Sequence, residues 1–348
     1  ARAPLVSPAR VLAVYNADGS LAAGDAQDSL AVSSVEGAVA GVAQALRSKG
    51  HEVRVLAAPN DPREALEFVA GFDCDAVFNL VESLAGDARA EAHFAACLEL
   101  RGIPYTGNSP LTLALCLHKP MARAVLAAHG VEIAKGAVLR RGDEPLEGLT
   151  YPLIVKPSRE DASHGIALES VVHDVRALRE RACFVIERYA QPALVEEFIP
   201  GRELNVGLTE GPKAGDPPRV LSLSEIDFTG YPAGEPQMVT YGAKWIEGSP
   251  EWNGTRSVDP VLDPALERRI REAALGAWRA LGLCGYARVD LRAEVGGAGR
   301  LAVIDVNSNP DLSPEAGFAL TVVRNGLPYA EFIDSILGFA LRRAPARA

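Results

Sequence analysis

Residues 286–307 read YARVDLRAEVGGAGRLAVIDVN, and this stretch decides the fold. Its two ends, 286–292 and 301–306, are short runs rich in apolar and β-branched residues, which predicts two strands. Because successive side chains of a strand point to opposite faces, we expect Arg288 and Asp290 on the same face of the first strand. This spacing indicates a polar patch built on a sheet.

The second strand carries a matching polar pair, Asp305 and Asn307, again two residues apart. If the two strands are neighbours, Asp290, Asp305 and Asn307 bring together the oxygen ligands of a Mg²⁺ site that water and substrate phosphates complete. Arg288 could then brace a phosphoryl oxygen or a developing oxyanion. A pair of surface salt bridges would use the same residues, but Asp305 interrupts an apolar run, where burying a carboxylate without a purpose is costly.

A lysine at the end of an apolar strand marks a second pattern, residues 152–165, PLIVKPSREDASHG. Lys156 ends the strand predicted over 153–156, and its ammonium is costly to bury unless it meets an anion. The small and polar loop that follows, which contains Ser163, could fold over phosphates with its backbone N–H groups. The loop is not a Walker A motif, because GxxxxGK[ST] is absent. A lysine that simply reaches solvent fits the pattern equally well.

An acidic hinge follows the strand predicted over residues 193–197. Glu196 and Glu197 end this strand, and the turn after it contains Ile199 and Glu203. Backbone groups at such a hinge can bind the edge of an adenine, and a glutamate can hold ribose hydroxyls. A solvated acidic turn is the commoner meaning of such a run.

Strands and helices alternate in the first third of the chain, which predicts a parallel sheet covered by helices on both faces. The predicted strands are 10–15, 52–57 and 76–80, and the predicted helices are 35–49, 63–70 and 90–101. The middle third, with helices over 119–129 and 174–188 and a further strand over 204–208, predicts one α+β sandwich. Residues 225–260 are rich in Gly and Pro and predict an irregular lid, because loops of this length are usually functional. Helices over 264–281 and 329–342 complete the chain.

Length and composition limit the possible functions. The chain has 348 residues, enough for two or three domains, and a net charge of −10, which argues against a general nucleic-acid-binding protein. Its five cysteines are odd in number and form no CxxC pair, which favours reduced thiols in a cytoplasmic protein. No run of 18 apolar residues occurs, so we expect neither a signal peptide nor a membrane span.

Taken together, these motifs resemble the ATP-grasp superfamily, and within it D-alanine–D-alanine ligase. The resemblance is carried by IPYTGNS at 103–109, KPSRE at 156–160, YGAKW at 241–245 and the two polar strands. It implies an ATP-grasp fold that combines α/β and α+β parts: an N-terminal parallel-sheet (pre-ATP-grasp) domain over 1–117, a central domain over 118–208 and a C-terminal catalytic domain over 209–348. The last two would sandwich ATP, and residues 225–260 would form an ω-loop that closes the site.

The resemblance also implies a role for each candidate residue. The ATP phosphates would be held by Lys119, Lys156 and Ser163, and the adenosine by Glu196, Glu197, Ile199 and Glu203. Two Mg²⁺ ions, which Mn²⁺ could replace, would be bound by Asp290, Asp305 and Asn307. The catalytic residues would be Arg288, which stabilises a tetrahedral intermediate, and Lys244 on the lid. The implied reaction joins a carboxylate to an amine through an acyl-phosphate and releases ADP and phosphate.

Several positions depart from the family's pattern. Asp305 stands where a Glu is usual, Glu197 where a Lys is usual, and Trp245 where a Tyr is usual. Around the substrates, Glu82 replaces a His and Asp25 a Glu, and Ala316 and Gly317 replace the Ser-Leu pair that would hold a substrate carboxylate. The expected substrate contacts are Asp25, Glu82, Trp245 and Asp311.

Three of these residues, Asp25, Glu82 and Asp311, would make an acidic pocket. The hypothesis is therefore a product other than D-alanyl-D-alanine, made from an amino acid, amine or peptide with an extra amino or basic group. Carboxylates that merely face solvent are the simpler alternative. Two other functions remain open, an ATP-grasp kinase that stops at phosphoryl transfer and a non-catalytic nucleotide or metabolite sensor. A homodimer is expected by analogy alone.

Overall fold

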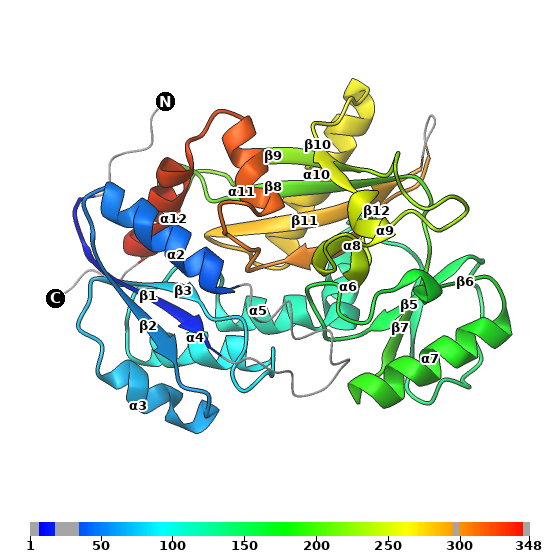
Figure 1. The fold of residues 1–348 in the computed structure, drawn as a ribbon, viewed down its shortest axis with the longest axis horizontal. Helices are drawn as coiled ribbons and strands as arrows, with labels where there is room; N and C mark the ends of the chain where they lie inside the picture. The colour runs from blue at the N-terminus through cyan, green and yellow to red at the C-terminus, as the bar shows by residue number, and fades with distance from the viewer. Residues whose placement is uncertain (1–6, 18–34, 295–298, 344–348) are drawn as a thin grey trace.

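The computed structural model describes residues 7–17, 35–294 and 299–343, and it contains three β-sheets. Figure 1 shows the N-terminal sheet on one side of the molecule, a four-stranded sheet on the other side, and a five-stranded sheet above them. Helices α5 (Pro110–Leu117) and α6 (Lys119–Ala128) run between these parts. The chain has the predicted ATP-grasp fold, with a parallel sheet followed by two antiparallel sheets.

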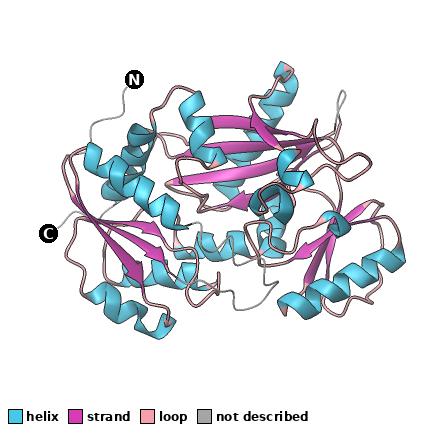
Figure 2. Ribbon diagram, viewed as in Figure 1, coloured by secondary structure: helices cyan, strands magenta, loops and turns pink. Residues whose placement is uncertain are grey.

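The N-terminal sheet is parallel, with the strand order β2-β1-β3. Its strands are β1 (Arg10–Asn16), β2 (Glu52–Ala58) and β3 (Ala76–Leu80). Alternate residues of β1 enter two different apolar cores, because the sheet is covered on both faces. Helices α2 (Val35–Ser48) and α12 (Tyr329–Arg343) cover one face, and α3 (Ala65–Ala70) and α4 (Ala90–Leu100) cover the other (Figure 2). The predicted parallel sheet is confirmed.

The four-stranded sheet has the order β4-β7-β5-β6 and is antiparallel. It consists of β4 (Gly136–Leu139), β5 (Leu153–Pro157), β6 (Val171–Val172) and β7 (Ala193–Glu197). Helix α7 (Val175–Tyr189) packs on one face and closes an apolar core with β5 and β7. Asp174 caps this helix by accepting a hydrogen bond from the N–H of Ala177.

The five-stranded sheet has the order β10-β9-β8-β11-β12 and is also antiparallel. Its strands are β8 (Arg202–Thr209), β9 (Arg219–Asp227), β10 (Arg256–Val258), β11 (Tyr286–Ala293) and β12 (Leu301–Asn307). Helix α10 (Pro264–Ala280) closes an apolar core with this sheet, and helix α11 (Gly317–Arg324) contacts β9. The other face of β11 and β12 carries the polar residues of the predicted metal patch.

Three sequence predictions require correction. Strand 204–208 belongs to the five-stranded sheet as part of β8, not to the middle sandwich. Residues 225–260 are not wholly irregular. Strand β9 extends to Asp227, and it is followed by α8 (Tyr241–Trp245), α9 (Pro250–Asn253) and β10. Strands β4 and β6 and helices α5 and α11 were not predicted, since each is short and lacks a clear period, and β9 was not predicted either.

No single helix among the described residues is long and apolar enough to cross a membrane, although α5 and α6 together, bent by 102°, pass that test by length and composition. All five cysteines are free in the structure.

Candidate active site

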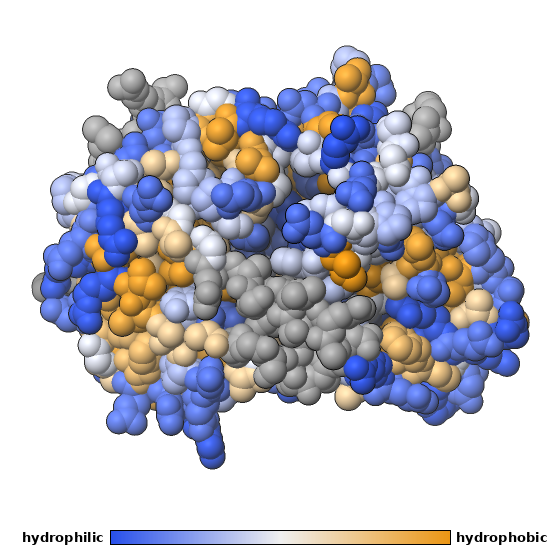
Figure 3. Space-filling view, in the orientation of Figure 1, coloured by the Kyte–Doolittle hydropathy of each residue, from blue (hydrophilic) through white to orange (hydrophobic). Residues whose placement is uncertain are grey.

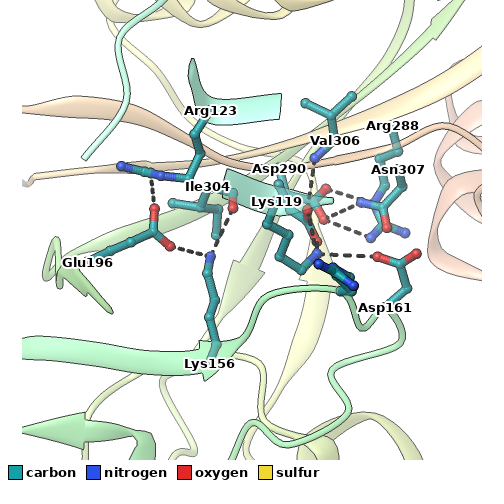
Figure 4. Close-up of polar contacts among 12 residues, drawn as sticks. Lys119, Arg123, Lys156, Asp161, Glu196, Arg288, Asp290, Ile304, Val306 and Asn307 are labelled. Atoms are coloured by element: carbon teal, nitrogen blue, oxygen red, sulfur yellow. Dashed lines mark hydrogen bonds and ion pairs between the residues drawn. The ribbon is translucent and has the colours of Figure 1, made fainter. Parts of the chain in front are cut away.

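The polar patch predicted from residues 286–307 forms on strands β11 and β12, which are antiparallel neighbours. Arg288 lies opposite Asn307, and Asp290 lies opposite Asp305. The Arg288 guanidinium donates to both oxygens of Asp290, at 2.7 and 2.8 Å. Asn307 Nδ2 donates to the same carboxylate at 2.9 Å, and Asn205 Nδ2 of β8 donates to it at 2.8 Å. The prediction that these side chains share one face is confirmed, and Asp290 lies at their centre (Figure 4).

Lys119 reaches this patch from the first residue of α6. Its backbone N–H donates to the carbonyl of Ser158, which fixes the helix start against the loop after β5. Its Nζ donates to both oxygens of Asp305 at 2.8 Å and to Asp161 at 3.3 Å. Burial opposes the charged forms, but the two carboxylates raise the pKa of Lys119, and Lys119 and Lys156 lower the pKa of Asp305. The result is a partly buried ion pair between a helix and a strand.

Lys156 reaches β12 from β5 of the four-stranded sheet. Its Nζ donates to the carbonyl of Ile304 at 3.2 Å and contacts Glu196, which also contacts Arg123. In Figure 4, Lys156 points toward Ile304 and Glu196, and Lys119 lies next to Asp161 and the Asp290 cluster. The two lysines therefore face a common strand from the four-stranded sheet and from α6.

The hinge residues are held by a side chain that sequence analysis missed. Arg292 Nε donates to the carbonyl of Ile199 at 2.6 Å, and Arg292 Nη1 donates to Glu203 at 2.7 Å. Burial raises the pKa of Glu203, and Arg292 opposes this shift. Glu197 instead accepts from the N–H of Thr150 at 3.0 Å and from Arg300 at 3.1 Å. The alternation Arg288–Asp290–Arg292 could have identified Arg292, since all three share one face of β11.

The lid is joined to the loop after β5. Trp245 Nε1 of α8 donates to the carbonyl of Ala162 at 2.8 Å, and Lys244 Nζ lies 5.0 Å from the centre of the Trp245 ring system. Ala162 and Ser163 both have left-handed backbone angles, with φ of 53° and 62°. Strained residues of this kind often cluster at ligand sites. Burial lowers the pKa of Lys244, as does the Arg288 guanidinium, while nearby carboxylates oppose the shift.

A cavity of about 670 Å³ opens beside this cluster, a volume suited to small-molecule binding. Six predicted site residues line it: Glu82, Lys244, Trp245, Arg288, Asn307 and Asp311. Figure 3 shows hydrophilic residues around a central recess on the face in view. The described lining residues do not include the other predicted site residues, which are Lys119, Lys156, Ser163, the hinge residues, Asp290 and Asp305. Asp25 lies outside the described residues.

The comparison with known proteins decides the family. The family model for the C-terminal part of D-alanine–D-alanine ligase matches residues 127–338. The chain belongs to the D-alanine–D-alanine ligase family. It is thus a D-alanine–D-alanine ligase-like, ATP-dependent carbon–nitrogen ligase.

Relatives of this family resemble most of the chain. It is 34% identical to D-alanine–D-alanine ligase of Geobacter sulfurreducens, over 69% of this chain and 70% of that protein. It is 33% identical to the uncharacterized protein y4sG of Sinorhizobium fredii, over 77% and 75% of the two chains. The crystal structure of D-alanine–D-alanine ligase from Bacillus anthracis complexed with ATP has a TM-score of 0.73 at 21% identity, covering 97% and 98%.

One buried carboxylate of this ligase-like site has no counterpart in the sequence predictions. Glu91, on the first turn of α4, lines the cavity and is only 7% exposed. Asn309 Nδ2 donates to Glu91 Oε1 at 2.8 Å, and the Tyr286 hydroxyl donates to Asn309 Oδ1 at 2.7 Å. Burial raises the pKa of Glu91 well above its usual value. Sequence reasoning missed it because one Glu in an Ala-rich helix is typical of an exposed position.

Proposed function

We propose that the chain joins a carboxylate to an amine at the expense of ATP, through an acyl-phosphate, with release of ADP and phosphate. The observation that carries this proposal is the convergence of Lys119 and Lys156 on β12, whose Asp305 lies opposite Asp290. A carboxylate is a poor acyl donor, and phosphoryl transfer turns its oxygen into a better leaving group. Such a transfer asks the protein mainly for positioning and charge neutralisation.

Lys119, Lys156 and the loop containing Ser163 would hold the phosphates of ATP. Both lysines contact carboxylates, so phosphate oxygens would take over part of these contacts. The adenine would lie against Glu196, Glu197 and Ile199, and the ribose against Glu203. Arg292 supports this assignment, because it holds the Ile199 carbonyl and Glu203 in one place.

Asp290, Asp305 and Asn307 fit a magnesium site by chemistry, since all three offer hard oxygen atoms from neighbouring strands. In the described part of the chain, no group of three or more His, Cys, Asp or Glu residues could hold a metal ion alone. Phosphate oxygens and water would therefore complete the coordination, which suits Mg²⁺ or Mn²⁺ brought with the nucleotide. When bound, the metal would neutralise charge on the transferred phosphoryl group.

Arg288 would stabilise the oxyanion of the tetrahedral intermediate, because Asp290 orients its guanidinium through two hydrogen bonds. Lys244, in α8 of the lid, would add positive charge near the same point. The hydrogen bond from Trp245 to Ala162 joins this lid to the phosphate loop. A closed lid would exclude water, which otherwise hydrolyses an acyl-phosphate.

The cavity supports the hypothesis of a substrate that carries an extra amino or basic group. Glu82 and Asp311 line it together with Glu91, which Asn309 holds in place. The carboxylates of Glu82 and Asp311 favour a cationic substituent, whereas the raised pKa of Glu91 favours its neutral form. Under this hypothesis, at least one substrate is an amino acid, amine or peptide other than D-alanine.

The test is ATP turnover with a panel of carboxylate and amine pairs and Mg²⁺. A ligase releases ADP and free phosphate in equal amounts and yields an amide product by mass spectrometry. An ATP-grasp kinase would release ADP and a phosphorylated product without free phosphate. A sensor would bind nucleotide and consume none, and activity confined to D-alanine would refute the proposed substrate class.

A further inference from the structure

A second, small cavity adjoins the main one on the five-stranded sheet. Its volume is about 30 Å³, so it holds only a few atoms. Its lining residues are Asn205, Gly207, Ser222, Ser224, Arg288, Gly317, Phe318 and Thr321. Two of these residues, Arg288 and Gly317, also line the main cavity. The small cavity is therefore an annex of the candidate active site.

The strand register explains why this annex is polar. Arg288 lies opposite Gly207, and Gly207 lies opposite Ser222. In the next row, Asp290 lies opposite Asn205, which lies opposite Ser224. Because residues paired across strands share a face, the polar patch continues from the candidate metal ligands into the annex.

Two hydroxyl groups in the annex lack partners. Ser222 and Ser224 are each 4% exposed. Within the described ranges, neither side-chain oxygen takes part in a hydrogen bond, although both residues line the cavity. Both hydroxyl groups therefore face the space of the annex, where they are available to bind a polar group of a ligand or water.

The backbone keeps the annex open at two glycines. A Cβ added at Gly207 would lie 2.3 Å from Ser222 Oγ and 2.3 Å from the Phe318 ring. A Cβ added at Gly317 would meet no atom within 4 Å, because this residue faces open space in both cavities. A large side chain at Gly317 would therefore fill the passage between the cavities.

We propose that the annex is a specificity pocket for the side chain of an amino-acid substrate, and that it takes a short, uncharged group with a hydroxyl or carboxamide. This inference rests on the proposed ligase function. A cationic group would face the Arg288 guanidinium, and an anionic group in the annex would compete for that guanidinium with the oxyanion of the tetrahedral intermediate. A methyl group would leave Ser222 and Ser224 unsatisfied, whereas a hydroxyl or amide can donate to or accept from both.

The experiment compares serine, asparagine, alanine, aspartate and lysine of both configurations, each as carboxylate donor and as amine acceptor, with Mg-ATP. We expect kcat/KM for serine or asparagine to exceed that for alanine by about tenfold, the effect of one or two hydrogen bonds. Ser222→Ala with Ser224→Ala should bring this ratio toward one, and Gly317→Leu should do the same by filling the passage. Leu223→Val, on the same strand but facing the α10 side, is the matched control and should keep the ratio.

Two results would overturn the inference: a wild-type enzyme that uses alanine as well as serine and asparagine, or a ratio that survives the double serine substitution. The annex would then hold only water. A second measurement separates this failure from failure of the proposed function, because bound ligand raises the melting temperature. If no pair consumes ATP, the ligase proposal fails, and a serine- or asparagine-specific melting shift that the double substitution removes would still support the pocket.

Discussion

Replacing Arg292 with Met should show how strongly one buried cation holds the hinge together. Arg292 is 4% exposed and binds Glu203 as well as the carbonyls of Ile199, Gly201 and Gln237. Without it, Glu203 stays buried and loses its cation. Removing one partner of a buried ion pair costs about 3–5 kcal/mol. Glu203→Gln should cost less, about 1–2 kcal/mol, because Arg292 keeps three carbonyl partners.

Urea unfolding of the two single variants and of the double variant forms a double-mutant cycle. If the pair acts as described, the double variant loses about 2 kcal/mol less than the sum of the single variants, because no unpaired carboxylate remains. Arg271→Met is the control, since Arg271 forms an exposed i,i+4 pair with Glu267 that contributes about 0.3–0.5 kcal/mol. If the free energies of unfolding lost by the two single variants add up to the loss of the double variant within about 0.5 kcal/mol, the two residues do not act as an ion pair.

The destabilisation caused by Arg292→Met should depend on pH, because burial raises the pKa of Glu203 in the folded protein. A carboxyl group with a raised folded-state pKa stabilises the protein when protonated, and this stability is lost as the pH rises through that pKa. The penalty of Arg292→Met should therefore be smaller at pH 5 than at pH 8. The same substitution should also raise KM for ATP, since it frees the Ile199 carbonyl and Glu203, whereas Arg271→Met should leave that KM unchanged.

Three further substitutions test other parts of the site. Asp290→Asn should lower turnover by about 10²–10³-fold or more and also lower the melting temperature, because it removes the carboxylate partner of Arg288; residual ATP binding by calorimetry would separate the loss of turnover from unfolding. Because the pKa of Glu91 is raised in the folded protein, the wild type should lose free energy of unfolding as the pH rises above the ordinary pKa of Glu. Glu91→Gln should remove this loss. If urea unfolding of the variant kept the pH dependence of the wild type, the assignment would be wrong. Trp245→Phe should remove the hydrogen bond to Ala162 and raise KM for ATP by up to about tenfold, and an equal KM would show that this contact does not hold the lid.

The sequence predicted those parts of the site that depend on strand alternation. Arg288, Asp290 and Asn307 lie together because their spacing places them on one face of neighbouring strands. Ranges such as 76–80 and 193–197 agree with the structure residue for residue, because apolar runs of this length have few alternatives. Local patterns of this kind could be read without any knowledge of the tertiary structure.

The contacts between distant segments could not be predicted in the same way. Nothing near Glu91 in the chain indicates that Asn309 lies against it, and nothing near Ser222 indicates a cavity shared with Gly317. The edge of the lid was misjudged for a related reason. The Gly and Pro content of residues 225–260 predicted a loop, but pairing with β8 extends β9 to Asp227.

The charges of the site imply how the nucleotide must bind. Lys119 pairs with Asp305, Arg288 with Asp290, and Lys156 with Glu196, so these buried cations already have carboxylate partners. ATP that draws Lys119 to its phosphates leaves the partly buried Asp305 beside additional negative charge, unless a divalent cation arrives with it. Because a partly buried carboxylate that loses its cation costs about 1–3 kcal/mol, ATP affinity in EDTA should be about 10–10²-fold lower than with Mg²⁺. Asp305→Asn should reduce this dependence in calorimetric titrations, and equal ATP affinity with and without Mg²⁺ would exclude Asp305 as a metal ligand.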